Sequence, residues 1–187
     1  MYQISVSGAS KGDSAEEGKT LAQAAGRAIA SAGYSIMTGA TVGIPFYAAQ
    51  SYKQAGGKMS LGISPASSKV EHVVKYRLPT GPFDVVLYSG LHYVGRDSLL
   101  INSCDAVISI GGRIGTLHEF TIAMETNTPI GFLEGGGGIS TEITDILKAA
   151  NRGKSEDIIF GTNATEILEQ LTEVLNKRNH KHIDLYR

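Results

Sequence analysis

One short stretch of the chain combines residue types that bind phosphate and handle charge beside it. Residues 111–119 read Gly-Gly-Arg-Ile-Gly-Thr-Leu-His-Glu, so three glycines and a threonine precede Glu119. Glycine lets a backbone turn through positive φ and approach a ligand closely, and a helix that begins there offers free N–H groups to an anion. A carboxylate beside such a cradle can stabilise positive charge or activate water. The pattern predicts a phosphate-bearing ligand with Glu119 next to it.

Two further glycine-containing loops follow apolar runs earlier in the chain. Gly8 to Gly12 follows the run 4–6, and Thr38 to Gly43 follows the run 34–37. Parallel strands bring the loops at their carboxyl ends to one edge of a sheet, so we expect the three loops to share a ligand. The alternative is that each is only a tight strand-to-helix turn. The predicted phosphate- or nucleotide-binding residues are Gly8, Ser10, Lys11, Thr38, Gly39, Gly43, Gly111, Gly112, Arg113, Gly115 and Thr116.

Known nucleotide-binding fingerprints are absent from these loops. Gly8, Ser10 and Gly12 do not spell G-x-G-x-x-G, and no G-x-x-x-x-G-K-[ST] occurs in the sequence. The first motif is typical of dinucleotide-binding enzymes and the second of P-loop kinases and ATPases. These classes therefore lose support.

Strand-like and helix-like segments alternate along the whole chain. This order favours an α/β fold with a doubly wound, Rossmann-like parallel sheet of about seven strands and helices on both faces. Residues 64–83 show no clear helical period. We expect one domain over residues 1–187, with 178–187 as a frayed tail. Expected strands are 4–6, 34–37, 59–63, 84–88, 106–110, 129–133 and 158–160; expected helices are 15–32, 43–55, 91–103, 116–126, 140–151 and 164–177.

The composition of the chain excludes several classes of protein. Glycine makes up 23 of 187 residues with only 5 prolines and no fixed period, which excludes collagen and argues against a disordered linker. The formal net charge of −1 gives no global basic field for nucleic acid or an anionic membrane. No apolar run is long enough to cross a bilayer, and the first residues resemble a strand rather than a signal peptide. The single cysteine, Cys104, excludes an internal disulfide and fits a cytoplasmic location.

The 111–119 motif resembles the signature of the Lonely-Guy (LOG) family, often labelled lysine decarboxylase-like. That signature is G-G-x-G-T-x-x-E, often preceded by proline, and here one extra residue gives G-G-x-x-G-T-x-x-E. Arg96 resembles the family's arginine on the preceding helix, and residues 38–49 resemble its second glycine loop and helix. The resemblance covers roughly residues 2–175. The chain departs from it at Ile110, where many members have proline, and at Asp97, where many active members have lysine.

The resemblance implies a phosphoribohydrolase that cleaves the N-glycosidic bond of a nucleoside 5′-monophosphate such as AMP. Glu119 and Arg96 would then be the catalytic residues, because the oxocarbenium-like transition state needs a carboxylate near the anomeric carbon. No metal or cofactor is required. The resemblance also implies a homodimer. Related members carry molybdenum cofactor, so the alternative is a carrier or sensor without turnover; a third option is a purely structural scaffold.

Several residues have a plainer alternative role. Thr116 and Glu119 are spaced as a helix capping box, like Ser14 with Glu17 and Asn163 with Glu166. Arg96 could be a solvated helix arginine, and we expect Cys104 in the core. His118 lies near the predicted pocket, and the glycine run 135–138 predicts a mobile loop with no assigned role.

Overall fold

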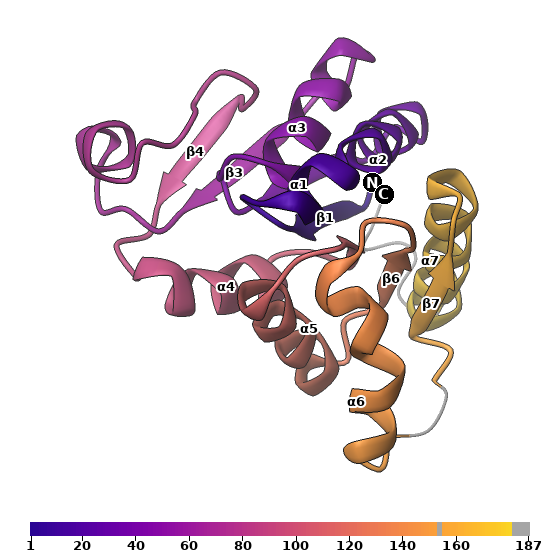
Figure 1. Ribbon diagram of the computed structural model, residues 1–187. Coiled ribbons are helices and arrows are strands. Elements are labelled where there is room, and N and C mark those ends of the chain that lie inside the picture. Colours follow the sequence, from indigo (N-terminus) through magenta and orange to yellow (C-terminus); the bar gives the residue numbers. More distant parts are fainter. Residues whose placement is uncertain (153–154, 181–187) are drawn as a thin grey trace.

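The computed structural model describes residues 1–152 and 155–180, and within them seven parallel strands form one sheet (Figure 1). The strand order is β4-β3-β2-β1-β5-β6-β7, so β1 lies at the point where the winding direction reverses. This is the predicted doubly wound, Rossmann-like architecture, in which ligands bind at the carboxyl ends of the strands near that switch point. The strands are β1 (Gln3–Gly8), β2 (Ser35–Thr38), β3 (Ser60–Ser64), β4 (Val85–Tyr88), β5 (Ala106–Ile110), β6 (Ile130–Leu133) and β7 (Ile158–Gly161).

Helices cover both faces of the sheet. The α2, α3 and α7 helices pack on one face, and α4, α5 and α6 lie on the other (Figure 1). The α-helices are α1 (Asp13–Glu17), α2 (Lys19–Ser31), α3 (Ile44–Gln54), α4 (His92–Asn102), α5 (Ile114–Thr126), α6 (Ile143–Ala149) and α7 (Ala164–Asn179).

The apolar core is divided by the sheet. The larger part holds β1 side chains such as Ile4 and Val6 against the alanine-rich face of α2 and the leucines of α7. The opposite part contains Phe120 of α5 and Phe132 of β6, whose rings meet edge to face. Because side chains alternate along a strand, β5 and β6 place apolar residues on both faces of the sheet, whereas β1 places Ser5 and Ser7 on the face opposite Ile4 and Val6.

Element boundaries differ from the prediction in four places. The helix expected over 15–32 is broken at Gly18 into α1 and α2. The irregular segment 64–83 contains a π-helical turn, η1 (Glu71–Lys75). The helix expected from residue 140 begins as a 3₁₀ turn, η2 (Gly138–Glu142). The last helix runs through Asn179 rather than ending at 177, and residues 181–187 of the expected tail lie outside the described residues.

Two of the three expected capping boxes do not form. Ser14 lies inside α1, whose N-cap is Gly12, and α5 has Arg113 rather than Thr116 at its N-cap. Asn163 does cap α7, because its side chain accepts hydrogen bonds from the backbone N–H groups of Thr165 and Glu166. The spacing of polar residues alone could not distinguish these cases.

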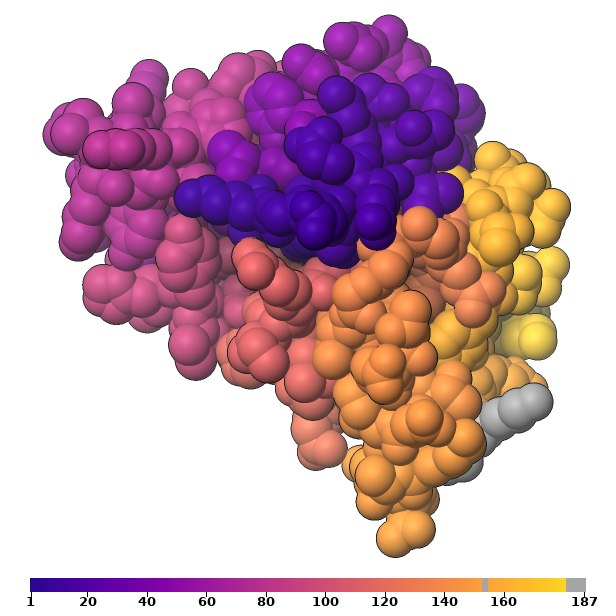
Figure 2. Space-filling model, in the orientation of Figure 1, coloured from indigo at the N-terminus to yellow at the C-terminus, as the bar shows by residue number. Residues whose placement is uncertain are grey.

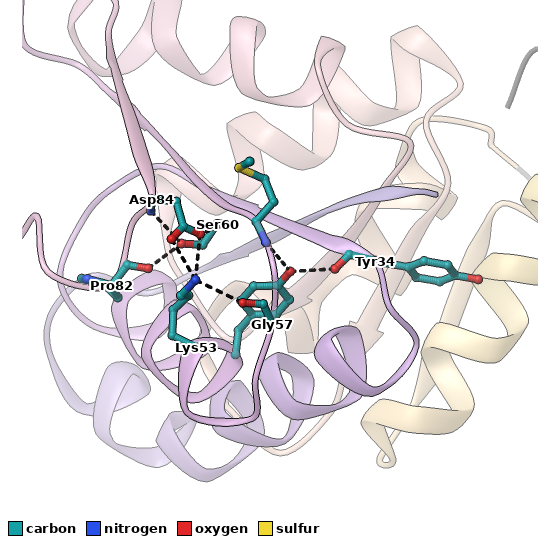
Figure 3. Close-up of polar contacts among 8 residues, drawn as sticks. Tyr34, Lys53, Gly57, Ser60, Pro82 and Asp84 are labelled. Atoms are coloured by element: carbon teal, nitrogen blue, oxygen red, sulfur yellow. Dashed lines mark hydrogen bonds and ion pairs between the residues drawn. The ribbon is translucent and has the colours of Figure 1, made fainter. Parts of the chain in front are cut away.

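A polar cluster at the amino ends of β3 and β4, the amino-edge cluster, fastens these strands to α3 (Figure 3). Its members are Lys53, Gly57, Ser60, Pro82 and Asp84. Lys53 Nζ lies 2.8 and 2.9 Å from the two carboxylate oxygens of Asp84 and donates to the Gly57 carbonyl at 3.1 Å. The Ser60 amide donates to Asp84 at 2.8 Å, and the Ser60 hydroxyl donates to the Pro82 carbonyl.

None of the described helices combines the length and the apolar character needed to cross a bilayer.

Candidate functional site

A cavity of about 450 Å³ opens at the carboxyl ends of β1, β2 and β5, next to the switch point of the sheet. Figure 2 shows this side of the molecule, where the N-terminal segment (indigo) lies against the chain around residues 110–140 (salmon to orange). The volume is in the range of small-molecule sites. Of the predicted site residues, eight line the cavity: Gly8, Ser10, Gly39, Arg96, Arg113, Gly115, Thr116 and Glu119.

Glu119 projects from the second turn of α5 and is only 7% exposed. The hydroxyl of Ser7, on β1, donates a hydrogen bond to its Oε2 atom. Burial raises the pKa of Glu119 to about 7, against the opposing effect of the nearby Arg96 guanidinium. Since the α5 N-cap is Arg113, Glu119 does not serve a capping box, and that alternative is wrong.

Arg96 lies on α4 and is 5% exposed, so the alternative of a solvated helix arginine is also wrong. Its Nη1 atom is 3.9 Å from Glu119 Oε1, and the Tyr93 ring lies 5.8 Å from its guanidinium carbon. Its Nε atom is 3.3 Å from Asp97 Oδ1 but has no hydrogen bond of good geometry. The guanidinium is therefore held mainly by charge.

Gly39 makes room for Arg96. A Cβ atom at this position would lie 1.5 Å from Arg96 Nη1. Residue 39 follows β2, so this loop contributes to the site by allowing the arginine to approach its backbone. Gly39 lines the cavity as predicted, and the structure adds the reason that a larger residue would displace Arg96.

The N-terminus of α5 forms the other end of the cavity. The amides of Ile114, Gly115 and Thr116 belong to its first turn and have no partner within the helix. An anion placed there would also meet the positive end of the helix dipole. Arg113 lines the same rim, with its guanidinium 3.5 Å from the Lys11 carbonyl.

Gly111 and Gly112 shape the turn into α5 rather than line the cavity. Both have positive φ, at 57° and 97°, and the Gly112 amide already donates to Ser14 Oγ at 2.9 Å. The predicted cradle therefore loses this amide, while those of Gly115 and Thr116 remain open. Sequence reasoning missed Ser14, whose hydroxyl in turn donates to the Gly136 carbonyl.

The glycine run 135–138, to which the sequence assigns no role, supports this turn. The Ile139 amide donates to the Gly112 carbonyl at 2.9 Å, and Ser140 Oγ donates to the Gly111 carbonyl at 2.8 Å. A Cβ atom at Gly138 would lie 2.2 Å from the same Gly112 carbonyl oxygen. Because these residues are glycines, the loop after β6 can pack directly on the turn that leads into α5.

Besides Gly111 and Gly112, three predicted residues lie outside the cavity wall. Lys11 is exposed, and Gly43 is the N-cap of α3, where the Ile44 amide donates to the Ala9 carbonyl. Thr38 is fully buried, and its Oγ1 atom accepts a hydrogen bond from the Ala40 amide. Their observed contacts support the loops that carry the cavity.

Asp97 and Tyr93 are among the cavity residues that were not predicted as members of the site. Asp97, beside Arg96 on α4, is 4% exposed, and its Oδ2 atom is 2.9 Å from His118 Nδ1. Tyr93 lies three residues before Arg96, a spacing that places both on one face of a helix. That helical spacing from Arg96 is the signal that would have found Tyr93; the contact between Asp97 and His118 has no such signal. We refer to Ser7, Arg96, Asp97, His118 and Glu119 as the Glu119 cluster.

The pattern of the SLOG cluster4 family matches residues 1–168 of the sequence. The chain belongs to the SLOG cluster4 family. An uncharacterized protein of Archaeoglobus fulgidus is 28% identical over 134 residues, which are 72% of this chain and 81% of that protein. The predicted resemblance to LOG-like proteins and their molybdenum-cofactor-carrier relatives is confirmed at the level of family and fold.

Solved structures share the SLOG cluster4 fold at low sequence identity. The X-ray structure of TM1055 superposes with a TM-score of 0.76 at 23% identity, covering 95% of this chain and 99% of that one. A molybdenum cofactor binding protein from Rippkaea orientalis superposes with a TM-score of 0.72 at 23% identity, covering 93% and 97%.

Among the described residues of this SLOG cluster4 protein, no group of three or more His, Cys, Asp or Glu side chains is arranged to hold a metal ion. Cys104, expected in the core, is partly buried and packs against it, and burial raises the pKa of its thiol to about 12. His72, which is fully buried, is within hydrogen-bond distance of Ser64 Oγ at 2.8 Å and of the Pro79 carbonyl at 3.0 Å.

Proposed function

We propose that the cavity binds a nucleoside 5′-monophosphate such as AMP and hydrolyses its N-glycosidic bond to free base and ribose 5-phosphate. The observation that carries the proposal is the environment of Glu119: a buried carboxyl group with one hydroxyl donor, beside a buried arginine, at the floor of a cavity. An under-hydrogen-bonded buried carboxyl group costs stability, and such costs are concentrated at functional sites.

The first turn of α5 would receive the 5′-phosphate, because Gly115 and Thr116 line that end of the cavity and amides of a first turn have no helix partners. The ribose would then extend toward Glu119, whose carboxylate would stabilise the oxocarbenium-like transition state or activate water. Arg96 would orient the substrate and hold Glu119. These roles need no metal.

The pKa of about 7 suits Glu119 to this chemistry. A group that titrates near neutral pH is present in both protonation states and can take up or release a proton during turnover. A carboxyl group with its ordinary pKa would be almost entirely ionised under the same conditions.

The test is release of free base from AMP, GMP, CMP and UMP, followed by chromatography. We expect the wild type to release base from at least one nucleotide and Glu119→Gln to be slower by about 10²–10⁴-fold. Glu125→Gln is the matched control, since Glu125 lies on the same helix with its side chain 77% exposed. Equal release by Glu119→Gln, or no release by the wild type from any of the four, contradicts the proposal.

A second candidate function is a carrier or sensor that binds a phosphate-bearing ligand without turnover. The fold shared with the molybdenum cofactor binding protein favours it, as does the chain's own Asp97, which places a second carboxyl group beside Arg96. This function predicts stoichiometric binding by calorimetry, no base release, and affinity for AMP or molybdenum cofactor that changes little in Glu119→Gln.

We further propose that the protein acts in the cytoplasm on small ligands as a homodimer, with no nucleic-acid or membrane partner. The homodimer is supported by exposed apolar side chains on β4 and at the start of α4. Val85 is 50%, Leu87 45%, Leu91 50% and Val94 70% exposed. Paired apolar surfaces of this kind are common in dimers. Light scattering on the purified protein should give twice the chain mass, and Leu87→Glu should give the monomer; a monomeric wild type contradicts the homodimer.

A further inference from the structure

Asp97 and Glu119 both face the same arginine, but at different distances. Arg96 Nε is 3.3 Å from Asp97 Oδ1, whereas Arg96 Nη1 is 3.9 Å from Glu119 Oε1. Asp97 also contacts His118 Nδ1 at 2.9 Å through its other oxygen. Both carboxyl groups are more than nine-tenths buried, so water cannot screen them well.

One guanidinium cannot fully compensate two buried carboxylates. Asp97 has the closer arginine contact and the imidazole, while Glu119 has the more distant arginine contact and the Ser7 hydroxyl. Two carboxyl groups that share a site resist ionising together, so a shared proton stays on the group with the weaker partners. By these contacts that group is Glu119.

We propose that Asp97 is a positioning residue that competes with Glu119 for Arg96 and so favours the protonated form of Glu119. His118 holds Asp97 from the opposite side and so orients it toward the arginine. The inference concerns the charge of Glu119 and stands whether the cavity hydrolyses its ligand or only binds it. In either case a neutral Glu119 does not repel a phosphate-bearing ligand as it enters.

The charged and titratable groups around Glu119 agree with this arrangement. Burial is the largest influence and raises the pKa of Glu119 to about 7; Asp97 raises it as well, whereas Arg96, Ser7 and His118 lower it. Cys104, which also interacts with Glu119, remains a neutral thiol because burial raises its pKa to about 12. Of these neighbours, Asp97 is the carboxyl group that opposes ionisation.

The experiment is a pH titration of the protein labelled with δ-¹³C glutamate, followed by NMR without any ligand. The Glu119 signal is assigned by its absence in Glu119→Gln. We expect a wild-type midpoint near 7 and, in Asp97→Asn, a midpoint lower by about one pH unit or more, because asparagine keeps the shape but removes the charge. Asp97→Glu, which retains the charge, should remain nearer the wild type.

Asp84→Asn is the matched control, since it removes a carboxylate from the amino-edge cluster and should leave the Glu119 midpoint in place. An unchanged or higher midpoint in Asp97→Asn overturns the proposal, as does a wild-type Glu119 that titrates near its ordinary value of 4.5. If Asp97→Asn does not fold, as judged by its amide spectrum, the smaller and equally neutral Asp97→Ser carries the same expectation. Because no nucleotide is used, absence of base release from AMP leaves this result unaffected.

Discussion

The amino-edge cluster and the Glu119 cluster lie at opposite ends of the same sheet and use the same chemical groups differently. Asp84 accepts hydrogen bonds from Lys53 and from the Ser60 amide, and these interactions, led by the Lys53 hydrogen bond, lower its pKa (Figure 3). Glu119 accepts one hydroxyl hydrogen bond, and burial raises its pKa to about 7. The ionised form of Asp84 is therefore stabilised by several donors, whereas that of Glu119 has a single hydroxyl donor.

The difference follows from what each cluster must leave open. Lys53 fills the space next to Asp84, so its ionised form is stabilised and the strands are held together. Next to Glu119 the space is a cavity, and Arg96 stays 3.9 Å away. A site that binds a ligand needs partners that are still available, and the cost is lower stability of the free protein.

Filling the space that Arg96 occupies should have the largest effect, and the effect should be on ligand affinity. In Gly39→Ala the new methyl group would occupy the position of the guanidinium, so Arg96 must leave the cluster. We expect affinity for AMP, measured by calorimetry, to fall by about 100-fold, consistent with losing a charged contact to the ligand.

Gly81→Ala is the control for this substitution, since a Cβ atom there meets nothing within 4 Å and φ is not positive. Unchanged affinity in Gly39→Ala would mean that Arg96 does not contact the ligand.

Neutralising Glu119 should make the protein more stable at high pH. The folded-state pKa is raised from 4.5 to about 7, so the wild type loses stability as pH rises through this window and the free energy of unfolding is lowest above it. Glu119→Gln should therefore be more stable than wild type by up to about 3 kcal/mol at pH 8, with little difference at pH 4.5 or below.

Urea unfolding at several pH values measures this difference. A Glu119→Gln protein that is less stable at pH 8 would show that the Glu119 carboxylate stabilises the fold, as Asp84 does in the amino-edge cluster.

Breaking the amino-edge cluster should lower the stability of the protein, whereas Glu119→Gln should raise it. Lys53→Met leaves Asp84 without its cation, and since both side chains are about one-third exposed we expect a loss of only about 1–2 kcal/mol in unfolding free energy. Because the pKa of Asp84 is lowered from 3.8, the stabilisation is present above that pH and disappears as pH falls through the folded-state value. Base release from AMP should not change; a change would link the two clusters.

Removing the single hydroxyl donor to Glu119 should have the smallest effect. The Ser7 hydrogen bond favours the ionised form, so Ser7→Ala should raise the Glu119 midpoint by about one pH unit or less in the same NMR titration. A fall in the midpoint would mean that Ser7 instead stabilises the protonated form.

Most of the fold could be predicted because the signals are local. Apolar runs and helical periodicity placed all the strands and nearly all the helices within two residues of their observed bounds, and alternation of the two predicted the parallel sheet. The exceptions depend on packing. Gly18 divides α1 from α2 where a Cβ atom would lie 2.8 Å from Ile44 Cδ1, a contact between distant segments.

The site was predictable in its centre and not in its surroundings. Glu119 and Arg96 stand out by type and motif, and both line the cavity. The role of Asp97 depends on its distance to an imidazole 21 positions away, and that of Gly136 on a hydroxyl 122 positions away. Such pairs have no periodic signature.

The sequence by itself determined the α/β alternation, the glycine turns and the presence of a carboxyl group beside a helix entrance, because each depends on residues within one or two turns of one another. Only the tertiary structure decided the charge environment of that carboxyl group. It buried Glu119, placed Arg96 against Gly39 and gave Asp97 the closer arginine contact. A pKa is set by burial and by charges a few ångströms away, and these are fixed when distant segments pack together.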